Sequence, residues 1–114
     1  MESSVFWHVT LTVAGPPVTL AQIHDGLECL SYEHPFMLSG RYAVDHAEVH
    51  YWEEAPDVAT ATDLALSLWP EHRASAGLPR WHVVGLEILE RAIYRSRCAE
   101  PHRPLVIDGV APFA

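Results

Sequence analysis

In VFWHVTLTVAGPPVTLAQIHDGLECLSY (residues 5–32), the apolar residues change their spacing at a glycine–proline turn. In residues 5–13 every second side chain is apolar, which predicts a strand with one dry face. Residues 19–32 place apolar side chains along one stripe of a helix, and Thr19 is a candidate N-cap. A strand followed at once by a helix is the first half of a β-α-β unit, in which the helix packs back onto the sheet.

A β-hairpin is predicted to follow this first helix. Residues 36–44 and 47–53 both alternate, and a turn at Asp45-His46 would join them. In this register the apolar side chains of both strands lie on one face of the hairpin, and the polar ones lie on the other.

A second helix and a fourth strand complete the pattern. Asp57 is a favourable N-cap for a helix over residues 58–69, and Pro70 would kink that helix or start a new one. Residues 81–89 again alternate as a strand. The tail, residues 99–114, is rich in proline and could add an edge strand or reach a partner.

The element order β-α-β-β-α-β predicts an α+β fold. Right-handed crossovers would place two helices on one face of a four-stranded antiparallel sheet. Over residues 5–95 this order resembles the ferredoxin-like superfold, a two-layer sandwich that carries many functions. We therefore expect one domain over residues 1–98, followed by a C-terminal tail over residues 99–114.

The turn VAGPPVTL (residues 13–20) resembles the glycine-containing turn of ACT-type amino-acid-binding regulatory domains, which share the βαββαβ order. Gly15, Leu20 and Ile23 match that pattern in kind, whereas Ala14 stands where an acidic residue often precedes the turn. The resemblance implies a small ligand bound near this turn, usually across a subunit interface.

Composition excludes several classes of function. The chain has 114 residues and a net charge of −8, from seven Lys+Arg against fifteen Asp+Glu, which argues against binding nucleic acid. No apolar run approaches the ~20 residues that span a bilayer, so we expect no membrane partner. The N-terminal residues lack the features of a secretory signal, and Cys29 and Cys98 are expected to be reduced thiols. These features favour a cytoplasmic protein.

The helix-free face of the predicted sheet is unusually aromatic. By alternation, it would present Phe6, His8, Thr10, Thr12, Met37, Ser39, Arg41, Glu48, His50, Trp52, Trp81, Val83, Gly85 and Glu87. Large aromatic groups on an open face indicate that something covers them. A second copy of the chain, a small ligand, or the protein's own tail would each serve. The predicted ligand site consists of Phe6, His8, Arg41, His50, Trp52 and Trp81.

Signatures of catalysis are missing from the sequence. None of the eight histidines has zinc-ligand spacing, and no nucleotide or nucleophile motif occurs, so we expect neither metal nor cofactor. The preferred hypothesis is a non-catalytic protein that self-associates, as a homodimer or a higher oligomer, and binds a small ligand or partner. An alternative is a cofactor-independent enzyme of the dimeric α+β barrel type, with His8 or His50 as acid/base. A third is a subunit of a larger assembly that docks through PLVID (residues 104–108).

Overall fold

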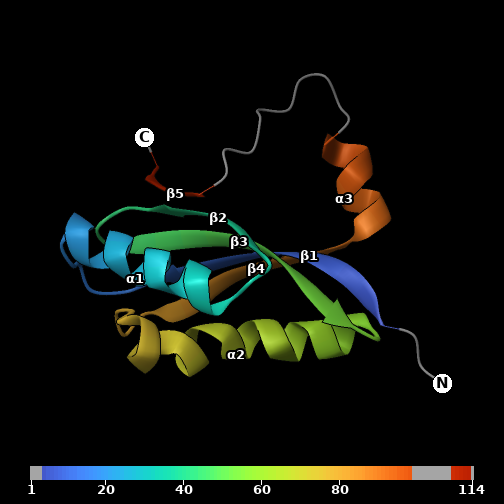
Figure 1. The fold of residues 1–114 in the computed structure, drawn as a ribbon, viewed down its shortest axis with the longest axis horizontal. Coiled ribbons are helices and arrows are strands. Elements are labelled where there is room, and N and C mark those ends of the chain that lie inside the picture. Colours follow the sequence, from blue (N-terminus) through green and yellow to red (C-terminus); the bar gives the residue numbers. More distant parts are fainter. Residues whose placement is uncertain (1–3, 99–108, 114) are drawn as a thin grey trace.

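The computed structural model describes residues 4–98 and 109–113 of the chain. Five strands and three helices lie within these residues (Figure 1). In chain order they are β1 (Val5–Ala14), α1 (Leu20–Glu33), β2 (Met37–Tyr42), β3 (His46–Ala55), α2 (Val58–Ala76), β4 (His82–Glu90), α3 (Arg91–Cys98) and β5 (Gly109–Pro112).

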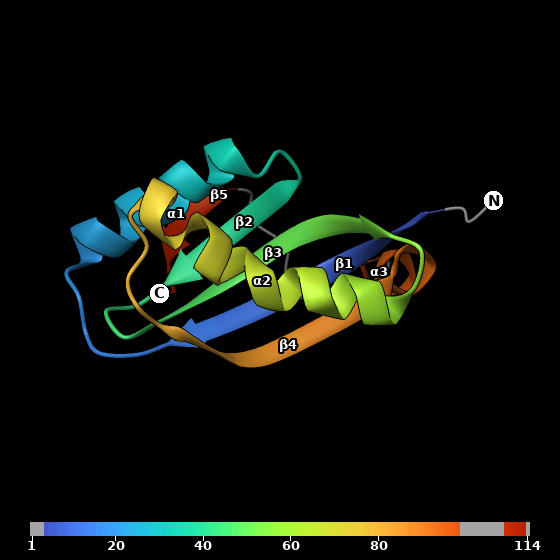
Figure 2. The same ribbon diagram turned by 90° about the horizontal axis from the view of Figure 1, so that it is seen from below.

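The strands form one mixed sheet in the order β4-β1-β3-β2-β5. The first four strands pair antiparallel, and β5 runs parallel to β2. Helices α1 and α2 cover one face of this sheet, whereas α3 lies on the opposite face (Figures 1 and 2). The sheet therefore has a layer of two helices on one side and a single short helix on the other.

The prediction of a four-stranded antiparallel sheet with two helices is wrong, although the α+β class is confirmed. RAIYRSRC (residues 91–98), which follows the predicted fourth strand, forms a third helix, α3, on the face that was expected to be open (Figures 1 and 2). The outer edge of β2 is also occupied, because β5 pairs with it from Ser39↔Gly109 to Tyr42↔Pro112. An exposed edge offers unpaired backbone groups, and β5 satisfies those of β2. The proposed PLVID strand lies outside the described residues.

The predicted N-caps of α1 and α2 are confirmed. The hydroxyl of Thr19 accepts a hydrogen bond from the Gln22 amide, and the Asp57 carboxylate accepts one from the Thr60 amide. Each bond satisfies a backbone donor that a helix leaves free at its first turn. Helix α2 continues through Pro70 and ends at Gly77, which has a φ of 71° as a left-handed C-cap.

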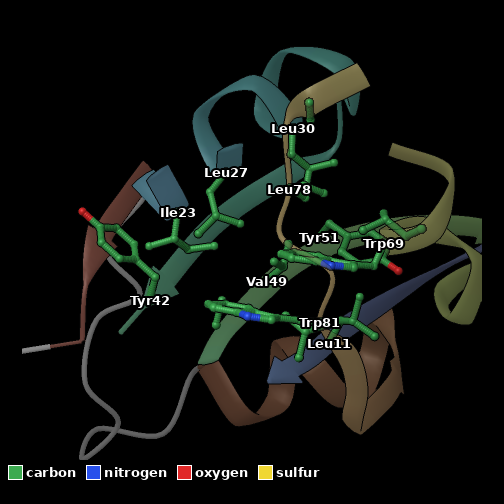
Figure 3. Close-up of a cluster of buried hydrophobic side chains, with 14 of the residues drawn as sticks. Leu11, Ile23, Leu27, Leu30, Tyr42, Val49, Tyr51, Trp69, Leu78 and Trp81 are labelled. Carbon is green, nitrogen blue, oxygen red and sulfur yellow. The ribbon is translucent and has the colours of Figure 1, made fainter. Parts of the chain in front are cut away.

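The main core lies between the sheet and the two helices α1 and α2 (Figure 3). Ile23, Leu27 and Leu30 of α1 are fully buried against β-strand residues such as Val49 and Leu11. This is the stripe that the helical spacing of the apolar residues predicts.

Trp81 belongs to this core, so the prediction that it lies on the helix-free face is wrong. Its indole is 4 % exposed and lies parallel to that of Trp69, with ring centroids 6.3 Å apart (Figure 3). The reason is a β-bulge in the β1–β4 pairing: Thr12 pairs with Gly85, but Val13 pairs with Val83, which leaves Val84 out. Because side chains alternate between the two faces, one extra residue places each side chain that precedes it on the opposite face of the sheet.

The hairpin has the predicted faces near its turn but a different register. Ala43 donates a backbone hydrogen bond to the carbonyl of His46, and Tyr42 pairs with Ala47, so the turn lies at Val44-Asp45, one residue earlier than expected. The pairing shifts by two residues in total. Since side chains alternate with a period of two, the faces of residues 39–42 are unchanged. A second shift, between Met37 and Ser39, pairs Met37 with Tyr51, so Met37 packs against the core and not on the helix-free face as predicted.

Candidate functional site

Helix α3 builds an aromatic cluster on the sheet face opposite α1 and α2, which was predicted to be free of helices and keeps the name helix-free face (Figures 1 and 2). The ring of Tyr94 stacks on the imidazole of His8 with centroids 3.8 Å apart and an angle of 16° between the planes. The indole of Trp52 meets both rings edge to face, at 5.3 Å from His8 and 5.1 Å from Tyr94. His8 is only 4 % exposed as a result. The aromatic face is thus partly covered by α3, a segment of the same chain.

A pocket opens at the end of this cluster, between α3 and the start of β2. It has a volume of about 220 Å³. Its lining consists of Phe6, Phe36, Trp52, Arg91 and Arg95. The rings of Phe6 and Phe36 meet edge to face with centroids 5.9 Å apart. Three aromatic side chains and two guanidinium groups therefore surround one pocket.

A second, larger hollow lies beside the first. Its volume is about 660 Å³, and it shares Phe6 and Arg91 with the smaller pocket. The remaining lining includes the acidic residues Asp57 and Glu90 and several backbone segments at the end of the sheet. The mixed charge of this hollow contrasts with the smaller pocket, whose lining has arginines and no carboxylate.

A row of polar side chains crosses the same face beside the aromatic cluster. His50 Nδ1 lies 3.2 Å from the Thr10 hydroxyl, and its Nε2 lies 2.6 Å from a carboxylate oxygen of Glu48. The imidazole ring of His8 is 5.6 Å from that of His50. In one tautomer the imidazole accepts a hydrogen bond from Thr10 and donates one to Glu48. Both ring nitrogens of His50 are therefore engaged.

Four of the six residues predicted for the ligand site lie together on this face: Phe6, His8, His50 and Trp52. Arg41 is on the same face of the sheet but near its other edge. Its guanidinium donates to the carbonyl of Gly109 on β5 and to that of Gly40.

The sequence-based site omitted Phe36, Tyr94, Arg91 and Arg95. Arg91 and Arg95 are four residues apart, as are two side chains on one face of a helix, and this spacing could have indicated a helix. No sequence pattern indicated that α3 folds back onto the sheet, which is what brings these residues to the site.

The turn that resembles an ACT-type ligand site is filled by the protein itself. The Trp81 indole nitrogen donates to the Pro16 carbonyl over 2.8 Å. A Cβ atom placed on Gly15 would lie 2.3 Å from Trp81 Cδ1. Glycine is therefore required at Gly15 for the close approach of an indole, and its φ is not positive.

A second polar cluster lies between α1 and α2. The Glu33 carboxylate accepts hydrogen bonds from Ser75 and His72, both over 2.7 Å, and these bonds lower the pKa of Glu33. Burial lowers the pKa of the neighbouring His34, and the proximity of His72 adds to this effect. Burial also raises the pKa of the Tyr51 phenol. Among the described residues, His34 Nδ1 and the Tyr51 hydroxyl have no hydrogen-bond partner.

The described residues contain neither a group of metal-binding side chains nor a helix suited to cross a membrane. Within residues 4–98 and 109–113, no three His, Cys, Asp or Glu side chains are grouped so that they could hold a metal ion. In the same ranges, no helix has the length and apolar character needed to cross a bilayer.

The fold and the site define a class: an α+β sandwich in which the sheet face opposite α1 and α2 carries a short arginine-rich helix over an aromatic cluster. The chain belongs to the family described as "Domain of unknown function (DUF8830)", whose model matches residues 6–105. No curated protein matches the chain.

Proposed function

We propose that this chain is a non-catalytic binding protein that holds a small ligand at the aromatic end of its helix-free face. The supporting observation is the pocket formed by Phe6, Phe36 and Trp52 beside α3. Phe36 is 50 % exposed although it contacts Phe6 edge to face. Half-exposed rings around a concave pocket are typical of sites where a ligand completes the burial of apolar surface.

The state of the two histidines favours binding over catalysis. His8 is stacked under Tyr94 and almost fully buried, so a substrate has no direct access to its ring. His50 has hydrogen-bonding partners at both ring nitrogens. A general base that takes a proton directly from a substrate needs a free nitrogen within reach of that proton.

The ligand part of this proposal is tested with naphthalene derivatives, which are flat apolar molecules. Changes in the amide and indole NMR signals of the intact chain are recorded as 2-naphthylmethanol is added. We expect the signals of Phe6, Phe36 and Trp52 to move together and Trp52→Ala to abolish the response. Trp69, which is buried in the main core between the sheet and helices α1 and α2, reports on non-specific effects. Shifts scattered over the molecule would refute the proposed pocket.

The proposal also includes self-association through the helix-free face, in the cytoplasm, as a homodimer or a higher oligomer. In the described part of the chain, α3 covers only one end of that face, and the rest of it carries partly buried side chains such as Thr12 and His50. Two such faces related by a twofold axis would cover each other.

Sedimentation of the intact chain tests self-association. We expect a species heavier than the 12.7 kDa monomer, which Thr12→Arg on the helix-free face would dissociate. Ala59→Arg, at an exposed position of α2, is the matched control and should leave the oligomer intact. A wild type that sediments as a monomer at micromolar concentration would overturn this part of the proposal.

The alternative, a cofactor-independent enzyme, is favoured by one observation: Thr10, His50 and Glu48 form a continuous hydrogen-bonded row. Such a row can activate a hydroxyl group as a nucleophile. Hydrolysis of 2-naphthyl acetate decides between the two functions. A rate above background that is lost in His50→Gln and Thr10→Val would replace the binding function with catalysis, and equal rates in all three proteins would support binding alone.

A further inference from the structure

We infer that the pocket at the aromatic end of the helix-free face binds an anionic ligand, one that joins a flat apolar body to a carboxylate or phosphate group. This inference rests on the proposed binding function and specifies its ligand class. The supporting observation is that Arg91 and Arg95 line the same pocket as the rings of Phe6, Phe36 and Trp52.

The distribution of charge along the chain supports an anionic ligand. The chain is strongly acidic, and its seven basic residues are all arginines. Three of these seven, at positions 91, 95 and 97, fall within the eight residues of α3, and this helix contains no acidic residue. Positive charge is thus concentrated at one place in a molecule that otherwise repels anions.

The positive charges of the two pocket arginines are not paired with carboxylates in the described part of the chain. Arg91 and Arg95 are exposed, and neither forms an ion pair with a carboxylate in the described ranges 4–98 and 109–113. Like charges four residues apart destabilise a helix. Arg91 also begins α3, where the helix dipole is positive and disfavours a cation. An anion bound between the two guanidinium groups would relieve both effects.

The chemistry of the lining matches the two parts of such a ligand. Guanidinium groups bind carboxylates and phosphates through paired, charge-assisted hydrogen bonds. The rings of Phe6, Phe36 and Trp52 offer apolar surface on which a flat group can stack. The pocket volume, about 220 Å³, suits a ligand with one or two rings. Glu54 pairs with Phe6 in the β1–β3 register and is exposed, but its carboxylate does not line the pocket.

Matched pairs of ligands separate the charge from the apolar body. Dissociation constants are measured by NMR titration for 2-naphthoate, 2-naphthyl phosphate and the neutral 2-naphthylmethanol. We expect both anions to bind the wild type at least about tenfold more tightly than the alcohol, which corresponds to about 1.4 kcal/mol. The anion that binds more tightly identifies the carboxylate or the phosphate as the preferred group.

Charge-removing variants locate the effect. In Arg91→Gln/Arg95→Gln both anions should lose this advantage while the alcohol binds as before, and Glu54→Gln should strengthen anion binding. Arg80→Gln, at an exposed position in the loop before β4, is the control and should change nothing. All four side chains are exposed, so their replacement should leave the fold intact, and a thermal melt of each variant verifies this.

The outcomes distinguish this inference from the proposed function. Should the wild type bind all three ligands equally, and the double variant behave like it, the pocket stands and the anionic ligand class is refuted. Should none of the three ligands bind at millimolar concentration, the proposed binding function itself fails.

Discussion

The phenol ring of Tyr94 lies flat against the imidazole of His8, with ring centroids 3.8 Å apart, and this contact fixes α3 to the sheet. Tyr94→Ala should therefore release α3. We expect faster amide hydrogen exchange in residues 91–98, greater quenching of Trp52 by acrylamide, and a loss of about 1–2 kcal/mol of stability. The matched control is Tyr32→Ala, because Tyr32 is 82 % exposed on α1. Unchanged exchange in α3 would show that other contacts hold the helix.

The close approach of Trp81 to Gly15 predicts the effect of a single methyl group. Gly15→Ala would place its Cβ 2.3 Å from Trp81 Cδ1, and rigid indole packing leaves little room to relax. We expect the free energy of unfolding to fall by about 1–3 kcal/mol in chemical denaturation. Trp81→Leu removes the clashing ring, so the double variant should lose less stability than the two single changes added together. Simple additivity would contradict the proposed clash.

The buried hydroxyl of Tyr51 predicts a stabilising substitution. The side chain is fully buried, and its oxygen has no hydrogen-bond partner among the described residues. Burying such a group without a partner costs about 1–3 kcal/mol. Tyr51→Phe keeps the ring and removes the hydroxyl, so we expect a higher free energy of unfolding, by about 1 kcal/mol. A loss of stability would instead reveal a buried water bound to this oxygen.

The buried imidazole of His34 predicts a dependence of stability on pH. Burial, aided by His72, lowers its pKa in the folded state below the ordinary value of 6.5. Between the folded and unfolded pKa values, the unfolded state binds the extra proton, so stability is present above pH 6.5 and declines as the pH falls below it.

Denaturation at pH 7.5 and 5.5 measures this decline, which should be smaller in His34→Gln. Burial raises the pKa of Glu53, so that this carboxyl adds stability as the pH falls, but its contribution is common to both proteins. The same decline in wild type and variant would assign it to another group.

Much of the local structure could be predicted because its causes lie within a few residues. The caps at Thr19 and Asp57 follow from side chains that reach the next turn of backbone. The faces of the hairpin near its turn follow from strict alternation, which a register shift of two residues does not disturb, whereas the irregularity between Met37 and Ser39 turns Met37 to the core. The aromatic end of the site was recognisable for the same reason: Phe6, His8 and Trp52 alternate within their own strands.

The remainder of the site depends on distant parts of the chain. Trp81 changes faces because Val84 is left out of the pairing with β1, and no pattern within residues 81–89 marks that bulge. The arginines of the pocket become neighbours of Phe6 and Phe36 only when α3 turns back over the sheet. His8, on which Tyr94 of α3 stacks, lies more than eighty positions earlier in the sequence.

The amino-acid sequence alone specified the α+β class, the order of the first six elements and the stripes that form the core, because periodicity and capping are short-range effects. The three-dimensional fold alone decided the fifth strand, the bulge and the position of α3. Each of these answers a long-range requirement: an unpaired edge at β2, an indole that must enter the core, and an imidazole that needs a cover.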